Sequence, residues 1–302
     1  MIEMNERILV ALRDAFLSRH SLESLPDAVW KRAGALNTWG TNAIEGNTLT
    51  RRDVEKLLLD EANMPGRPLR DVLETVQHEH AFRGLLARKD GPVTLETVLQ
   101  LHEVVFAGSA RADPGQWRRV NVRISGSDHR PPRYERVMGE MDAWRADYER
   151  RERAGEETFL LAAWMHQRFE SVHPFSDGNG RVGRLLLNLH FMKRNWPPLH
   201  ILPDDRGRYL DALEAGNRGD LGPLLALLRT NMARALIDLL DEVGTEQDEL
   251  KRLGAFASKS GYGAHYLSLR AGQGELPAVK EKGRWQTSAR AMALYQQHKA
   301  RP

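Results

Sequence analysis

The sequence predicts an all-α fold that is mostly helical, with one small β-hairpin inserted into it. Apolar residues recur at helical spacing in most of the first 245 residues. A single stretch, residues 120–125 (VNVRIS), instead alternates apolar and polar side chains with the period of two that marks a strand. With 41% hydrophobic and 28% charged residues, the composition is that of a soluble globular protein.

In chain order, the helical spacing predicts helices over residues 5–19, 51–62, 70–88, 94–107, 135–152, 156–171, 181–194, 206–215 and 221–241. Thr94 and Asp220 stand directly before two of these segments and are expected N-caps. The hairpin continues into a turn at residues 126–128, and two prolines after Arg130 exclude helix there. A lone hairpin is not stable, so we expect it to lie over the helices and flank a site.

Several classes of protein are excluded at once. The chain has no cysteine, which rules out a disulfide scaffold, a thiolate zinc site and a cysteine nucleophile. The longest apolar run is residues 159–165, whereas a membrane span needs about 20 residues, so no membrane partner is expected. The first residues include early acids and no signal-peptide pattern, so the expected location is the cytoplasm.

Charge is unevenly distributed along the chain. Residues 251–302 hold ten Lys and Arg against two Glu, a net charge of +8, while residues 1–250 carry a net charge of −5. The change falls near residues 244–249 (GTEQDE). This asymmetry predicts a separate basic segment with a polyanionic partner.

The segment HPFSDGNGRVGR, residues 173–184, carries the most chemistry. It is predicted to be a loop that opens a helix at about Gly180, where Gly178, Asn179 and Gly180 present backbone N–H groups to an anion. Arg181 and Arg184 lie three residues apart and leave the same face of the first turn.

Two further side chains complete this segment. Asp177 is a hard oxygen ligand suited to Mg²⁺, which commonly binds one or two carboxylates and substrate phosphates. His173 has an ordinary pKa near neutrality and suits a general base. A base, a metal ligand, an N–H cradle and two arginines together predict phosphoryl or nucleotidyl transfer.

The same segment resembles the signature of the Fic family, His-x-Phe-x-Asp/Glu-Gly-Asn-Gly-Arg-x-x-Arg, at all eight fixed positions. The resemblance extends from about residue 94 to residue 240 and includes RFESVHPF and RGRYLDALEAGNRGDLGPLL. It implies a mostly helical Fic core and an enzyme that transfers AMP from ATP to a Ser, Thr or Tyr hydroxyl of a target protein. Gly180 favours this chemistry, since a kinase-like branch of the family carries Lys there.

The resemblance also implies a role for each matching residue. His173 would deprotonate the target hydroxyl, and Asp177 would hold Mg²⁺ on the α- and β-phosphates. The remaining implied nucleotide contacts are phosphate contacts from Gly178, Asn179, Gly180, Arg181 (β-phosphate) and Arg184 (γ-phosphate), and looser adenosine contacts from Tyr209 and Asn217. The flap residues Gly126, Ser127, Asp128 and His129 would hold the target segment by strand addition.

Upstream, Thr41-x-x-x-Glu45-Gly46 resembles the inhibitory motif of the family. A carboxylate of Glu45 that reaches Arg184 would occupy the guanidinium meant for the γ-phosphate. The alternative is that Glu45-Gly46 only ends a helix.

The basic segment resembles an excisionase-like winged helix-turn-helix, with the order helix, turn, helix, hairpin, helix. In that comparison DNA would be contacted by His265, Ser268, Arg270, Lys280, Lys282 and Arg284. A basic protein-docking or dimer-forming segment is the alternative.

We therefore expect three domains, namely an N-terminal helical region with the inhibitory helix (1–93), a Fic catalytic core (94–244) and a basic helix-turn-helix-like domain (245–302). The expected partners are ATP, Mg²⁺, a target protein and DNA through residues 249–302, and a homodimer is left open. The main alternative is a DNA-binding regulator that senses ATP, and removal of AMP or use of another nucleotide also remains open. The sequence does not identify the target.

Overall fold

The computed structural model describes residues 4–107 and 113–299, and the chain divides into two compact units. One unit is Trp30–Leu225, and the other joins both chain ends, Met1–Val29 and Ala226–Pro302. The structure thus divides the chain at other positions than the predicted boundaries after residues 93 and 244. The cause is α1 (Glu6–Leu17), which packs against α13 (Ala289–His298) at the other end of the sequence.

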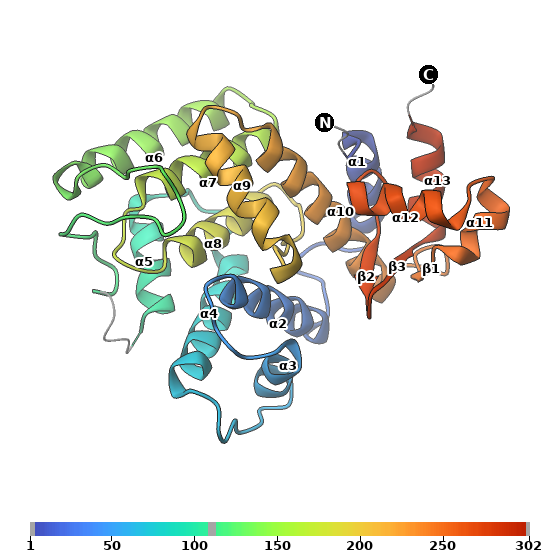
Figure 1. Cartoon of the computed structure of the whole chain (residues 1–302), viewed down its shortest axis with the longest axis horizontal. Helices are drawn as coiled ribbons and strands as arrows, with labels where there is room; N and C mark the ends of the chain where they lie inside the picture. Colours follow the sequence, from blue (N-terminus) through green and yellow to red (C-terminus); the bar gives the residue numbers. More distant parts are fainter. Residues whose placement is uncertain (1–3, 108–112, 300–302) are drawn as a thin grey trace. The chain divides into compact units, whose positions relative to one another are not determined.

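The unit Trp30–Leu225 is helical, as predicted (Figure 1). Its helices are α2 (Asp27–Ile44, which begins just before the unit), α3 (Arg51–Leu59), α4 (Leu69–Arg88), α5 (Leu95–Val105), α6 (Val137–Arg153), α7 (Thr158–Val172), α8 (Asn179–Met192) and α9 (Arg206–Asn217). Helix α8 is buried over nearly its whole length because it packs against α4, α5 and α7. The loop that precedes α8 is therefore anchored at the centre of the unit.

Local sequence signals set several helix ends. Thr94 caps α5 by accepting a hydrogen bond from the backbone of Thr97, and this confirms the predicted N-cap. Asp220 accepts from the backbone of Gly222 at the start of α10 (Gly222–Val243). Apolar spacing did not mark α2 as a helix, because its buried face is largely polar. The buried polar side chains of α2 are Asn37, Thr38, Thr41 and Asn42.

The predicted hairpin is wrong as a β-ladder. Residues 119–132 form an extended loop with a turn at Ser125 and Gly126, and no residue of it pairs as a strand with another described residue. The loop is held by other bonds, for example one from the backbone N–H of Tyr134 to Asn121 Oδ1 at 3.0 Å. The apolar alternation reflects partial contact with the protein below, since Val122 and Ile124 are half-buried whereas Val120 is exposed. We call residues 119–132 the flap.

The unit of the two chain ends contains α1, most of α10 and the basic segment. Its further elements are β1 (Lys251–Arg252), α11 (Gly254–Ser260), α12 (Ala264–Gln273), β2 (Val279–Glu281), β3 (Arg284–Thr287) and α13. The three strands form an antiparallel sheet of order β1-β3-β2. The predicted order of elements is therefore present. Among the described residues, no helix is long and apolar enough to cross a membrane.

Candidate active site

The loop between α7 and α8 begins at His173, which ends α7 in the left-handed conformation with a φ of 50°. Such a backbone is strained for a residue other than glycine, so surrounding bonds must hold it. Arg118 supplies them: its Nε donates to the carbonyl of His173 at 2.8 Å, and its backbone N–H donates to that of Pro174 at 2.9 Å. The same guanidinium donates to the carbonyls of Val120 and Pro132. Arg118, buried, thus ties the loop to the flap.

The imidazole of His173 is in the form that can accept a proton. Its Nδ1 lies 3.3 Å from the carbonyl oxygen of Glu170. A carbonyl only accepts hydrogen bonds, so Nδ1 carries the proton and Nε2 keeps a lone pair. Burial lowers the pKa of His173 to about 4, and this outweighs the opposing effect of the bond to Glu170. The ring is therefore neutral at pH 7.

Asp177 precedes α8 and faces its first turn. Its Oδ1 accepts a 2.6 Å hydrogen bond from the backbone of Gly178 and lies 3.4 Å from Arg181. His102 of α5 donates from Nε2 to the backbone carbonyl of Asp177 at 3.2 Å. The proton of His102 is on Nε2 because its Nδ1 accepts from the backbone of Gly115 at 3.0 Å. A neutral histidine thus fixes this part of the loop, and burial lowers the pKa of His102 to about 4.

The glycines and Asn179 shape the start of α8. Gly178 has a φ of 82°, and a Cβ there would overlap the ring of Phe106. A Cβ on Gly180 would overlap the carboxylate of Glu45. The buried amide of Asn179 bonds both ways with the backbone of Phe175, at 2.8 and 2.9 Å. These contacts brace the loop, and the predicted phosphate contact of Asn179 stays a prediction.

Arg184 forms a tight ion pair with Glu45. The distance from Arg184 NH2 to Glu45 Oε1 is 2.6 Å, and Arg184 Nε donates to Thr41 Oγ1 at 2.6 Å. The Arg184 side chain is 5% exposed and that of Glu45 is 38% exposed. Burial favours the neutral carboxyl, but the Arg184 guanidinium outweighs it and lowers the pKa of Glu45. Both predicted parts of the inhibitory motif, Thr41 and Glu45, thus contact the arginine.

A helix end places Glu45 there. Gly46 has a φ of 89°, its N–H donates to the carbonyl of Ala43, and the N–H of Asn47 donates to that of Asn42. This pair of bonds is the Schellman motif that commonly ends a helix at glycine. The motif is therefore a helix terminus that also contacts Arg184, and its inhibitory role stays a prediction.

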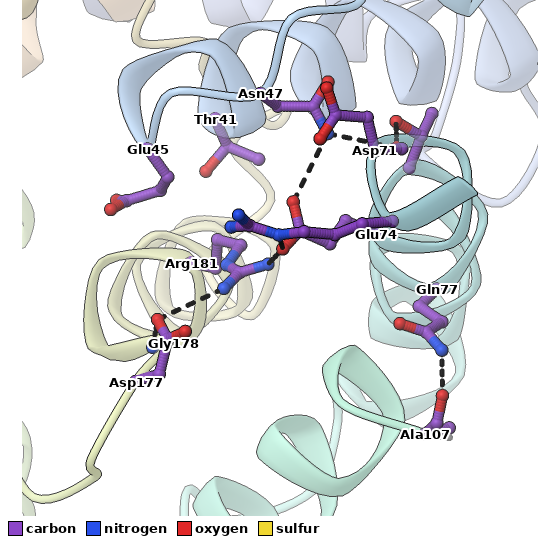
Figure 2. A network of polar contacts seen from close by, with 12 residues as sticks. Thr41, Glu45, Asn47, Asp71, Glu74, Gln77, Ala107, Asp177, Gly178 and Arg181 are labelled. Atoms are coloured by element: carbon purple, nitrogen blue, oxygen red, sulfur yellow. Dashed lines mark hydrogen bonds and ion pairs between the residues drawn. The ribbon is translucent and has the colours of Figure 1, made fainter. Parts of the chain in front are cut away.

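Arg181, only 2% exposed, is held more loosely than Arg184. Its NH1 lies 3.5 Å from Glu74 Oε1 and its NH2 lies 3.4 Å from Asp177 Oδ1. Its guanidinium stacks on Phe106 with 4.6 Å between the central carbon and the ring centre. Nε and NH1 have no hydrogen-bond partner among the described residues. Figure 2 shows this side chain between Glu74 of α4 and Asp177.

The middle of the unit Trp30–Leu225 is similar to proteins that are already known. Residues 92–191 match the Fic/DOC family model. The protein adenylyltransferase Fic of Culex quinquefasciatus is 29% identical over 235 residues, which are 74% of this chain and 45% of that relative. The chain spans about half the length of the curated relatives it matches.

Solved structures show that the chain has the Fic fold. A Fic domain containing signaling protein from Bacteroides thetaiotaomicron superposes with a TM-score of 0.69 and 22% identity, covering 78% of this chain and 97% of that one. Fic-1 from Caenorhabditis elegans superposes with a TM-score of 0.67 and 26% identity, covering 78% of this chain and 71% of that one. The mostly helical fold class is confirmed.

The flap lies against the helices of this Fic fold through side chains. Ser127 Oγ donates to Glu214 Oε2 at 2.6 Å, and Asn217 Nδ2 donates to the same oxygen at 3.2 Å. His129 donates from Nε2 to the backbone carbonyl of Ser171 at 2.9 Å. The structure thus brings Ser127, His129 and Asn217 of the predicted site together, while Gly126 and Asp128 are exposed.

Tyr209, the other residue assigned to adenosine, is buried behind Arg184. Its hydroxyl lies 2.8 Å from His166 Nε2 and 3.5 Å from Arg184 NH1. Because the other ring nitrogen of His166 lies against the carbonyl of Gly183, it is a donor and the tyrosine hydroxyl donates to Nε2. A contact of Tyr209 with adenosine stays a prediction.

Sequence reasoning missed several residues of the candidate site. Arg118 and His102 fix the loop, Glu74 faces Arg181, and Glu214 receives the flap. All four are charged or titratable residues that become adjacent to the motif only through the fold. Glu170, one turn before His173, was seen only as part of a helix. Burial raises the pKa of Glu170 to about 8, so its carboxyl is largely protonated at pH 7.

The six residues assigned to DNA divide into two groups. On the β2–β3 hairpin, Lys280, Lys282 and Arg284 are exposed. On α12, His265 is exposed and Ser268 half-buried, whereas Arg270 is bound to Glu275 and stacks on Tyr266. Direct base contact by Arg270 would require it to leave Glu275.

Proposed function

We propose that the chain is an autoinhibited protein adenylyltransferase, which transfers AMP from ATP to a hydroxyl side chain of a protein. The pairing of buried Arg184 with Glu45, beside a neutral His173, carries this proposal. It is supported by the match to the Fic/DOC family and by relatives named protein adenylyltransferase Fic.

In the proposed reaction, His173 acts as the general base. Its Nε2 accepts the proton of the target hydroxyl, and the hydroxyl oxygen attacks the α-phosphorus of ATP. The bond from the α-phosphorus to the bridging oxygen breaks, so AMP becomes attached to the target and pyrophosphate leaves. Arg118 holds the backbone of His173 in position, and the two arginines of α8 receive the charge of the β- and γ-phosphates.

Asp177 fits a magnesium ion that arrives with ATP. One oxygen of this half-exposed carboxylate is bonded to the loop, which leaves the other for a ligand. No group of three or more His, Cys, Asp or Glu among the described residues forms a metal cage. A single carboxylate with phosphates suits Mg²⁺. The ion would neutralise phosphate charge and orient the phosphates.

Glu45 is the proposed brake on this reaction. Its carboxylate occupies Arg184 and overlaps the space above Gly180, at the N-terminus of α8. A γ-phosphate competes with this carboxylate for the same guanidinium. ATP that binds while Glu45 stays in place therefore lacks the alignment needed for attack.

The test is incubation of wild type and Glu45→Gly with α-labelled ATP, Mg²⁺ and host lysate. We expect Glu45→Gly to label proteins well above wild type, and Glu45→Gly with His173→Ala to label them about 10²–10⁴-fold more slowly than Glu45→Gly. Equal labelling by wild type and Glu45→Gly contradicts the brake. If proteins are labelled by γ-labelled ATP and not by α-labelled ATP, AMP transfer is contradicted. Loss of label from a modified target protein identifies AMP removal.

We propose DNA binding as a second function, located in the basic segment. The observation in its favour is the exposed Lys280, Lys282 and Arg284 on the β2–β3 hairpin that follows the α11–α12 pair. Fluorescence anisotropy of the full chain with duplex DNA tests it, with an expected log–log salt slope of roughly −4 to −5 for about five phosphate contacts. Lys282→Ala should make the slope shallower by about one. No binding at low salt leaves the segment as a docking module.

A further inference from the structure

Arg181 is paired with a carboxylate that belongs to no part of the inhibitory motif. Glu74 Oε1 lies 3.5 Å from Arg181 NH1 and accepts a 2.9 Å hydrogen bond from Arg70 Nε. The Glu74 side chain is 13% exposed and that of Arg181 is 2% exposed. Both arginines of α8 therefore face a carboxylate from the N-terminal part of the chain. Arg184 faces Glu45 at the end of α2, and Arg181 faces Glu74 of α4.

The other oxygen of Glu74 faces the end of α2. Glu74 Oε2 accepts from Asn47 Nδ2 at 3.3 Å, and the same amide donates to the backbone carbonyl of Asp71 at 3.0 Å. The Asp71 carboxylate accepts from the backbone and hydroxyl of Thr48. Asn47 and Thr48 directly follow the Glu45–Gly46 helix end, so α4 holds the segment that positions the brake. Figure 2 shows Glu74 between Asn47 and Arg181.

We propose that Glu74 is a second inhibitory carboxylate, which opposes phosphate binding at Arg181 and holds the Glu45 segment in its inhibitory position through Asn47. This inference rests on the proposed function, and in particular on Arg181 as the β-phosphate contact. Nε and NH1 of the buried guanidinium make no hydrogen bond with the described residues, although NH1 forms the 3.5 Å ion pair with Glu74, so both atoms can donate to phosphate oxygens. A phosphate that binds them competes with Glu74.

The two carboxylates differ in how tightly they bind their arginines. Glu45 holds Arg184 by a 2.6 Å charge-assisted hydrogen bond, whereas Glu74 meets Arg181 only at 3.5 Å. Glu74 also shares its charge with Arg70. Arg181 is therefore the arginine to which a nucleotide phosphate binds first. Once a phosphate draws Arg181 away, Glu74 is freer to move and its bond to Asn47 weakens.

The experiment measures nucleotide affinity on the full chain in a His173→Ala background, so that no transfer consumes the nucleotide. Isothermal titration calorimetry in Mg²⁺ measures the affinities for AMP, ADP and ATP of the chain with Glu74 and of its Glu74→Gln variant. This substitution keeps the shape of the side chain and removes its charge. Coupling free energies between sites typically change affinity 5–150-fold. We expect ADP and ATP to bind at least about fivefold tighter to Glu74→Gln and AMP, which lacks the β-phosphate, to bind unchanged.

The matched control is Glu149→Gln on α6. Glu149 forms the same kind of i,i+4 pair, with Arg145 at 2.6 Å, and its ion pairs with Arg145 and Arg153 both lie within α6. Glu149→Gln should leave the affinities for AMP, ADP and ATP unchanged. In a background with intact His173, Glu74→Gln should also raise labelling, and the combination with Glu45→Gly should raise it by less than the product of the single effects, because both act on one brake.

The outcomes distinguish failure of this inference from failure of the proposed function. If Glu74→Gln binds AMP, ADP and ATP more tightly by the same factor, the effect is a general charge effect and the inference fails. If Glu74→Gln leaves the ADP affinity unchanged while Glu45→Gly labels fully, the proposed function stands and Glu74 has no part in it. If no variant labels any protein but ADP binds tighter to Glu74→Gln, the contact with phosphate stands and AMP transfer fails. Should Glu74→Gln fold poorly, Glu74→Asp, which shortens the side chain and withdraws it from Arg181, must give the same ADP and ATP tightening.

Discussion

At the scale of single residues, the site is governed by histidines and arginines that are fixed by backbone carbonyls. His173 and His102 each donate from one nitrogen to a carbonyl, and the direction of that bond sets which nitrogen is free. Arg118 binds the carbonyls of His173, Val120 and Pro132 with one guanidinium. The motif residues could be predicted from the sequence, whereas the bonds from Arg118 to His173 and from His102 to Asp177 join residues 55 and 75 positions apart.

The lowered pKa of His173 predicts the pH dependence of transfer. A base whose pKa is about 4 stays unprotonated throughout pH 6–8. The kcat/KM of Glu45→Gly reports the ionisation of the free enzyme, so protonation of His173 should not lower it between pH 8 and pH 6. Initial labelling rates at low target concentration measure this. His173→Ala should lower the rate by about 10²–10⁴ and still bind ATP. A rate that halves near pH 6.5 would place the pKa of the base at its ordinary value.

Arg118→Lys should disable transfer although it keeps the charge. A lysine cannot present the planar set of donors that reaches three carbonyls, so the strained backbone of His173 shifts. A displacement of about 1 Å at a reacting group costs about 10²-fold in rate. Labelling in the Glu45→Gly background measures the loss. Arg119→Lys, at an exposed neighbour, is the control and should retain the rate.

At the scale of elements, the site depends on how helices end. Helix α7 ends at His173, α8 begins at Gly178, and α2 ends so that Glu45 faces Arg184. The helices with an apolar stripe could be predicted closely, as for α4 and α10. Helix α2 could not be predicted from apolar spacing, because Thr38 and Thr41 are buried by polar contacts to His78 and Arg184. The flap was predicted as paired strands, yet Arg118 and Glu214 take the place of a ladder.

Gly46→Ala should weaken the proposed brake through the backbone next to Glu45. Gly46 has a φ of 89° with no atom near its Cβ position, so alanine adds backbone strain of about 1–2 kcal/mol and no clash. The end of α2 should relax and release Glu45, and labelling should rise above wild type. Gly34→Ala is the control on the same helix, where a Cβ makes ordinary contact with Phe82. A labelling rise in Gly34→Ala alone would contradict this account.

At the scale of the whole molecule, the proposed catalytic machinery and its brake lie in one unit, Trp30–Leu225. The charge asymmetry marks the basic segment in the sequence, and the structure places that segment in the unit that joins both chain ends. The charge asymmetry could not show that α1 joins that segment, because a contact between α1 and α13 leaves no local pattern in either helix. Apolar spacing predicts that a helix has a buried face and does not say what covers it.

Buried histidines should make the unit Trp30–Leu225 sensitive to acid. Burial lowers the pKa from 6.5 to about 3 for His78, His166 and His190. Between pH 6.5 and these values the unfolded chain binds more protons, so stability falls with acid by up to about 1.4 kcal/mol per pH unit for each histidine. Thermal unfolding between pH 7 and 4.5 measures the slope. His190→Gln should make it shallower, and His80→Gln, at an exposed site, should not.

The meeting of α1 and α13 has a consequence for the order in which the protein is made. Asn5, which caps α1, donates to the backbone carbonyl of His298, so this unit closes across almost the whole chain. A ribosome adds roughly 5–20 residues per second, so α1 waits on the order of tens of seconds for its partner. Residues 30–225 are all available before then. During synthesis Arg184 can therefore meet Glu45 while the terminal unit is still incomplete, so the proposed brake can form before the chain is finished.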